Sequence, residues 1–192
     1  ADETATGTVF NDANGNGRLD QGESGIPDVG VSNGRAVVKT DADGRYSIAV
    51  TDDTILFVIK PDGYRTRLDE NHVSRFYYIH KPNGSPKGLK FPGVAPTGPL
   101  PGQVNFALSR QKESEEFDVL FFGDPQPRTQ QEIDFMAHDV IEGLAGSDAA
   151  FGVTLGDILF DDLSLFDSFN RTVGKIGIPW YNVIGNHDIN YK

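Results

Sequence analysis

The sequence predicts two domains, an all-β sandwich in residues 1–110 and an α/β domain in residues 117–192. The first part consists of short β-type runs that are separated by turns rich in Gly, Pro and Asn. The second part alternates strand-like apolar runs with segments of helical periodicity. Residues 111–116, which lie between these parts, are polar and charged and are expected to form a linker. A chain of 192 residues can hold two small domains.

The first domain contains seven runs that we predict to be strands. Their length and spacing are typical of an immunoglobulin- or prealbumin-like sandwich. The Pro- and Gly-rich segment 82–101 is expected to be a long loop. The predicted strands are residues 7–10, 29–32, 36–40, 46–50, 55–60, 75–80 and 104–108.

The second domain shows the order β-α-β-α-β, with strands predicted at 117–122, 151–155 and 180–184. This order predicts a parallel sheet. A capping box, Thr129 with Glu132, starts the first helix, and Gly177 and Pro179 end the second. The predicted buried stripes are Ile133, Met136, Val140, Ile141 and Leu144 in the first helix, and Phe166, Phe169, Val173 and Ile176 in the second.

Composition and charge exclude several functional classes. The formal net charge of −11 argues against non-specific binding to nucleic acid, which needs a basic face. The chain has no cysteine, so disulfides, zinc–thiolate sites and thiol nucleophiles are excluded. No apolar run reaches the roughly 18 residues of a transmembrane helix. No signal peptide is visible, and we expect an exported protein from which one has been removed.

Polar side chains follow each predicted strand of the second domain. Asp124 and Gln126 follow the first, Asp157 follows the second, and the sequence Gly185–Asp188 follows the third. The C-terminal ends of parallel strands share one sheet edge, where ligands bind in open α/β sheets. Asp, Asn, Gln and His are ligands for hard or borderline divalent metals. A metal site is therefore predicted at this edge.

These motifs resemble those of the calcineurin-like metallophosphoesterases, whose pattern is D-x-H, then G-D, then G-N-H-D or G-N-H-E. The resemblance implies two divalent metals (Mn, Fe or Zn) and hydrolysis of a phosphate mono- or diester. It implies that Asp124 ligates the first metal, that Asp157 bridges both and that Asn186 ligates the second. It also implies that His187 donates to the phosphate or leaving group and that Asp188 orients His187.

The sequence departs from this family pattern in two ways. Gln126 stands where the family usually has His, and an amide oxygen is a harder and weaker ligand than imidazole. The resemblance covers only the first half of the family's four-layer α/β/β/α sandwich, without the later His ligands. We therefore expect a truncated or proteolysed catalytic domain, with one sheet face exposing apolar side chains. The alternative is that another chain supplies the missing half. Asp161 and Asp162 are interpreted as helix caps; the alternative is that they support the metal ligands.

The segment from Asp12 to Glu23 fits the twelve-residue loop template of EF-hand calcium sites. Its flanks are not helical, so we expect the loop without the helix–loop–helix frame. The alternative is an Asn/Gly turn without an ion. The longer stretch from Gly7 to Val31 also resembles the calcium-binding B-type repeats of bacterial surface proteins. The predicted calcium ligands are Asp12, Asn14, Asn16, Arg18 through its carbonyl, Asp20 and Glu23.

Two functional hypotheses follow. The first is an exported, metal-dependent phosphoesterase whose N-terminal β-sandwich positions the enzyme or binds a partner. The second is a non-catalytic, calcium-binding surface module with a degenerate phosphoesterase half. The intact Gly185–Asp188 motif favours the first. The motifs serve monoesters and diesters alike, so the phosphorylated substrate is left open.

Overall fold

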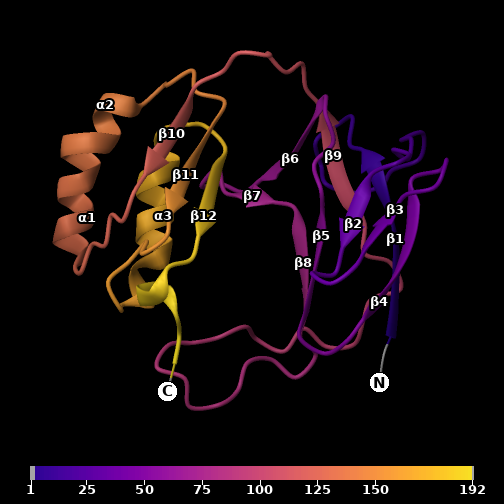
Figure 1. Ribbon diagram of the computed structural model, residues 1–192, viewed down its shortest axis with the longest axis horizontal. Helices are drawn as coiled ribbons and strands as arrows, with labels where there is room; N and C mark the ends of the chain where they lie inside the picture. The colour runs from indigo at the N-terminus through magenta and orange to yellow at the C-terminus, as the bar shows by residue number, and fades with distance from the viewer. Residues whose placement is uncertain (1–2, 192) are drawn as a thin grey trace. The chain divides into compact units, whose positions relative to one another are not determined.

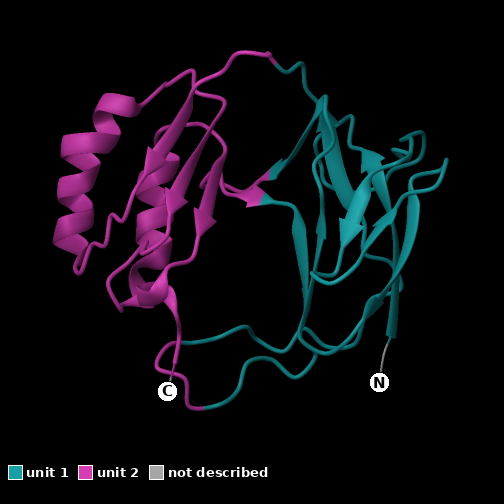
Figure 2. Cartoon of the chain, in the orientation of Figure 1, with its two compact units in different colours: residues 1–67, 75–87, 92–113 teal, residues 68–74, 88–91, 114–192 magenta. Residues whose placement is uncertain are grey.

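The computed structural model describes residues 3–191 and divides into two compact units (Figures 1 and 2). Unit 1 contains the chain up to Arg67, together with Arg75–Lys87 and Pro92–Glu113. Unit 2 contains the chain from Ser114 onward, together with Leu68–Ser74 and Gly88–Phe91. The boundary between Glu113 and Ser114 therefore lies within residues 111–116. That Leu68–Ser74 and Gly88–Phe91 belong to unit 2 was not predicted.

Two β-sheets build unit 1. Strand β1 pairs antiparallel with β4, from Glu3 opposite Val50 to Thr8 opposite Arg45, and parallel with β9. The five-stranded sheet has the order β4 (Arg45–Val50), β1 (Glu3–Asn11), β9 (Phe106–Arg110), β6 (Tyr64–Leu68) and β7 (Ser74–Arg75). The four-stranded sheet has the order β3 (Val37–Lys39), β2 (Gly30–Ser32), β5 (Thr54–Val58) and β8 (Tyr77–His80).

Side chains from both sheets form the core of unit 1. In β4 the alternation is strict: Tyr46, Ile48 and Val50 are buried and the residues between them are exposed. The Tyr46 hydroxyl donates to the Val104 carbonyl at 2.5 Å, and burial raises the pKa of Tyr46 well above its usual value. The buried hydroxyl of Tyr46 therefore has its hydrogen-bond acceptor within the core of unit 1.

The structure adds one strand to the prediction and divides another. Predicted strand 75–80 is split into β7 and β8 at Phe76. Strand β6 was not predicted, because its sequence Tyr64–Leu68 places two arginines among apolar and polar residues and buries only Thr66. Because the one buried residue of this strand is polar and its exposed residues are arginines, the sequence shows no alternation of apolar and polar residues.

A parallel three-stranded sheet forms the centre of unit 2, in agreement with the predicted strand order. Strand β11 lies between β10 and β12, with Val119 opposite Phe151 and Gly152 opposite Trp180. The strands are β10 (Val119–Phe122), β11 (Phe151–Leu155) and β12 (Trp180–Val183). The helical segments are α1 (Gln130–Met136), η1 (Ala137–Ile141), α2 (Glu142–Leu144), η2 (Leu163–Leu165), α3 (Phe166–Gly174) and η3 (Asn186–Asp188).

The two faces of this sheet differ. On one face Trp180 is fully buried, packs 4.9 Å from the Phe122 ring centroid and donates to Thr154 Oγ1 at 2.9 Å. On the other face Phe121, Leu155 and Val183 are each more than half exposed. Apolar side chains are therefore exposed on one sheet face, as the sequence predicts.

The first helix differs from the prediction in one residue and in one contact. Val140, predicted to be buried, is 42% exposed, because η1 is a π-helical turn that shifts the apolar stripe to Ile141. Thr129 caps the helix by accepting from the Glu132 N–H, but the Glu132 carboxylate accepts from the Arg128 N–H rather than from Thr129.

Among residues 3–191, the structure contains no helix with the length and the apolar surface that a membrane span needs.

Candidate functional site

Asp157 is the centre of a cluster of loops at the C-terminal edge of the unit 2 sheet. Its carboxylate accepts from Gln126 Nε2 at 2.9 Å and from the backbone N–H of His187 at 3.1 Å. Its carbonyl accepts from the Gln126 N–H at 3.1 Å. The loops after β10, β11 and β12 are therefore joined through one carboxylate, as the positions of the three motifs predict.

The backbone of these loops is strained. Asp124, Gln126, Asp157 and Asp161 have positive φ angles of 56°, 42°, 42° and 61°. This left-handed region is unfavourable for residues with a Cβ atom, and such strain clusters at functional sites. The conformation brings four polar side chains to a short stretch of one sheet edge.

Gly185 allows the third loop to approach Asp157. A Cβ atom at Gly185 would lie 2.0 Å from Asp157 Oδ1 and 2.2 Å from the Asp157 nitrogen. Contacts this short are impossible for a real side chain, so only glycine fits here. The glycine of the Gly185–Asp188 motif therefore has a steric role in the contact between the two loops.

His187 is held by an acidic partner and by an aromatic stack. Its Nδ1 lies 2.9 Å from Asp161 Oδ1, and its ring stacks on Phe160 with centroids 4.4 Å apart. The guanidinium carbon of Arg128 lies over the Phe160 ring, 4.3 Å from its centroid. The hydrogen bond to Asp161 raises the pKa of His187, and the charges of Asp161, Asp157 and Asp124 raise it further.

The side-chain partner of His187 in the structure is Asp161, whereas Asp188, predicted to orient His187, contacts the main chain. Its carboxylate instead accepts from the N–H groups of Ile158 and Leu159, each at 2.9 Å, and of Gly185 at 2.8 Å. These bonds tie the loop after β12 to the loop after β11. The predicted role of Asp188 came from the family resemblance; in the structure, the backbone turn of η3 directs the Asp188 carboxylate at main-chain donors.

Asp161, Phe160 and Arg128 are site residues that sequence analysis did not assign. Capping was the favoured interpretation of Asp161 and Asp162, and it holds for Asp162, which accepts from the Ser164 N–H at 3.1 Å. The alternative interpretation applies to Asp161, which supports a candidate site residue. The signal in the sequence for Phe160 and Asp161 was their position, three and four places after Asp157; Arg128 had no such signal.

The donor set is suited to a hard or borderline divalent metal, although it is not gathered into a closed site. Asp124 and Asn186 are exposed and present oxygens at this edge. Gln126 directs its amide nitrogen at Asp157; rotation of the amide would present its oxygen, which a cation between the two groups would favour. Within residues 3–191, no group of three or more His, Asp or Glu side chains is arranged to hold a metal ion.

The predicted calcium loop of unit 1 folds on itself. The Asp12 carboxylate, which is buried, accepts from the N–H groups of Asn16 at 3.1 Å and Gly17 at 2.8 Å. Glu23 accepts from the N–H groups of Ala13 and Asp20. Hydrogen bonds from the amides of Asn14 and Asn16 lower the pKa of Asp20. As expected, no helix flanks the loop in the described residues: β1 ends at Asn11.

A comparison with protein families gives one match. Residues 13–95 match the family model described as the N-terminal of calcineurin-like phosphoesterase. No curated protein matches the chain. The matched residues begin in the calcium-type loop and lie mainly in unit 1, whereas the metallophosphoesterase motifs lie between Asp124 and Asp188. The family match therefore covers a part of the chain that does not contain these motifs.

Proposed function

We propose that unit 2 carries part of the catalytic site of a metal-dependent phosphoesterase that hydrolyses a phosphate mono- or diester. The observation that carries this proposal is the junction at Asp157, where Gln126 and His187 from two other loops meet one carboxylate. The family match at residues 13–95 supports it independently, because it rests on residues outside these motifs. The proposed fold of unit 2 is the first half of the four-layer metallophosphoesterase sandwich.

The donor residues would have distinct roles. Asp124, Gln126, Asp157 and Asn186 would hold divalent metals, which supply an activated water and neutralise phosphate charge when bound. Gln126 in place of His would favour harder metals at the first position.

His187 is positioned for proton donation. Its Nδ1 is held by Asp161, which leaves Nε2 to face a substrate oxygen. The raised pKa favours the protonated ring, and a protonated imidazole can donate to a phosphoryl or leaving-group oxygen. Phe160 stacks on the ring and restricts its rotation. Asp188 holds the backbone of the loop in place.

The test is hydrolysis of p-nitrophenyl phosphate and bis-p-nitrophenyl phosphate by the chelator-treated protein after addition of Mn²⁺, Zn²⁺ or Mg²⁺. We expect turnover that requires added metal, and the ratio of the two rates will distinguish a monoesterase from a diesterase. Turnover that is unchanged by chelation would contradict a metal-dependent mechanism.

We also propose that the loop from Asp12 to Glu23 binds calcium and stabilises unit 1. The support is the match of six residues to the loop template and the burial of Asp12 in a loop that already turns its oxygens inward. A calcium site of this kind suits an exported protein. The calcium site does not depend on catalysis, so it would also be expected if the protein were a non-catalytic surface module.

Calcium that binds the native state should raise the melting temperature by mass action. We expect EDTA to lower the melting temperature of the wild-type chain, and added Ca²⁺ to restore it in the wild type but not in Asp12→Asn. Asp28→Asn is the matched control, because Asp28 is an exposed carboxylate that pairs with Lys39. A melting curve that EDTA does not move would refute the calcium site.

A further inference from the structure

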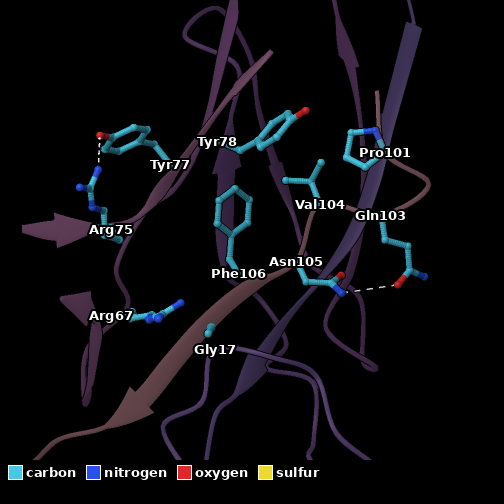
Figure 3. A pocket seen from close by; sticks show the side chains of 11 residues that line it. Gly17, Arg67, Arg75, Tyr77, Tyr78, Pro101, Gln103, Val104, Asn105 and Phe106 are labelled. Carbon is cyan, nitrogen blue, oxygen red and sulfur yellow. Dashed lines mark hydrogen bonds between the residues drawn. The ribbon is translucent and has the colours of Figure 1, made fainter. Parts of the chain in front are cut away.

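Unit 1 contains a pocket of about 330 Å³ between strands of its two sheets (Figure 3). Strands β6 and β7 contribute one wall, β8 contributes the rim, and β9 with the segment before it contributes the floor and the other wall. Such a volume is within the range of small-molecule sites. It lies outside the phosphoesterase motifs.

The pocket is basic in an acidic chain. Its lining contains the guanidinium groups of Arg67 and Arg75 but no carboxylate, whereas the formal charge of the whole chain is −11. Arg75 donates to the Tyr77 hydroxyl at 3.0 Å. Arg67 is exposed and lies against Gly17, where an added Cβ would come within 2.6 Å of Nη1. The exposed Arg67 guanidinium is a planar, permanently charged donor, and such a donor on this wall favours a carboxylate or a similar oxyanion.

The rest of the lining combines neutral hydrogen-bonding groups with an apolar floor. On the wall opposite the arginines, Gln103 and Asn105 present amides that are 3.5 Å apart (Figure 3). The Asn105 Oδ1 accepts from the Thr8 N–H at 2.8 Å, which orients that amide. Phe106 lies at the floor and Tyr78 lies above it (Figure 3). Aromatic faces, amides and phenols together suit a ring with hydroxyl groups and an apolar face.

We propose that this pocket binds an acidic sugar, that is, a saccharide ring that carries a carboxylate. Arg67 would bind the carboxylate, Gln103 and Asn105 would bind ring hydroxyl groups, and the C–H face of the ring would pack on Tyr78 and Phe106. Neither the family match nor the metallophosphoesterase motifs assign a ligand to these residues. The inference does not depend on the proposed catalytic function.

The test is a titration of the ¹⁵N-labelled 192-residue chain with galacturonate, followed by NMR at the amides of Phe106 and Ala107. We expect saturable shifts with a Kd on the order of 1 mM, as is reasonable for a small ligand. Galactose, which lacks the carboxylate, and inorganic sulfate, which lacks the ring, should each bind at least about tenfold more weakly, because each loses one set of contacts.

Arg67→Gln removes the proposed anchor and should weaken galacturonate binding about tenfold or more. Arg35→Gln is the matched control: it makes the same change in charge at an exposed residue of the β2–β3 turn, and it should leave binding unchanged. A melting curve for each variant checks that it folds. Three results would overturn the proposal: no saturable shift at about 20 mM galacturonate, equal affinity for sulfate, or unchanged binding by Arg67→Gln.

Discussion

The imidazole Nδ1 of His187 lies 2.9 Å from the carboxylate of Asp161, a residue 26 positions earlier in the chain. This contact joins the loops after β11 and β12 through side chains, in addition to the backbone bonds that Asp188 accepts. It makes Asp161, rather than Asp188, the residue that sets the orientation and protonation of His187.

Asp161→Asn should lower the pKa of His187 in the metal-free protein, because the hydrogen bond to Asp161 is the largest cause of its increase. When a pKa is raised in the folded state, the group stabilises the protein at pH values below its ordinary pKa of 6.5. This contribution is lost as the pH rises through the folded-state pKa. The variant should therefore be less stable than wild type at pH below 6.5, and the difference should shrink at high pH. Imidazole NMR titration and urea unfolding measure both effects.

The matched control is Asp139→Asn. Asp139 raises the pKa of His138 in the same way, through a contact of 3.0 Å on the exposed side of η1. This variant should lower the pKa of His138 and leave that of His187 unchanged. If Asp161→Asn leaves the pKa of His187 where it was, the assigned contact is wrong.

Gly152→Ala should destabilise unit 2. An added Cβ would lie 1.9 Å from the buried Trp180 ring, so the ring must move. Overpacking of this kind costs about 1–3 kcal/mol. Trp180 is the single tryptophan of the chain, so its fluorescence reports unfolding of this unit. Gly143→Ala, where an added Cβ meets no atom within 4 Å, is the control and should not lower the unfolding midpoint.

Glu113 should make unit 1 sensitive to acid. It pairs with Lys60 and accepts from the Gly63 N–H at 3.1 Å, and these bonds lower its pKa from 4.5 to about 2. A lowered pKa stabilises the folded state above the unfolded value, and this contribution is lost as pH falls from about 4.5 to 2. Because the pair is partly exposed, we expect about 1 kcal/mol.

Glu113→Gln should therefore reduce the free energy of unfolding at pH 7 by about 1 kcal/mol and have little effect near pH 2. Urea unfolding at the two pH values, followed by circular dichroism, measures the difference. An equal loss at both pH values would mean that the Glu113 charge is not the cause.

Sequence patterns predicted the parts of the fold in which one face is buried. The alternation of Tyr46, Ile48 and Val50, and the stripe of Phe169, Val173 and Ile176, correspond to buried residues. The β6 strand was missed because burial of Thr66 alone gives no apolar signal. Val140 was misplaced because a π-helical turn changes the helical period, and no residue type marks such a turn.

Prediction of the candidate site succeeded for position and failed for contacts. Strand ends located Asp157 and the loop that follows β12 at one sheet edge, because parallel strands end together. Which carboxylate faces His187 depends on positive φ angles at Asp157 and Asp161, which the sequence does not encode in any short motif. The pocket residues Arg67 and Asn105 come from β6 and from the segment before β9, and they show no common sequence pattern.

The most direct measurement of the central claim is the Mn²⁺-dependent rate of bis-p-nitrophenyl phosphate hydrolysis by wild type, Asp157→Asn and Asp162→Asn. Asp157→Asn removes the carboxylate at the centre of the site, whereas Asp162→Asn makes the same change at a helix cap that Asn also tolerates. We predict a loss of about 100-fold or more for Asp157→Asn and no loss for Asp162→Asn. Equal rates for wild type and Asp157→Asn, or no metal-dependent turnover by the wild-type chain, would contradict a catalytic metal site in these loops.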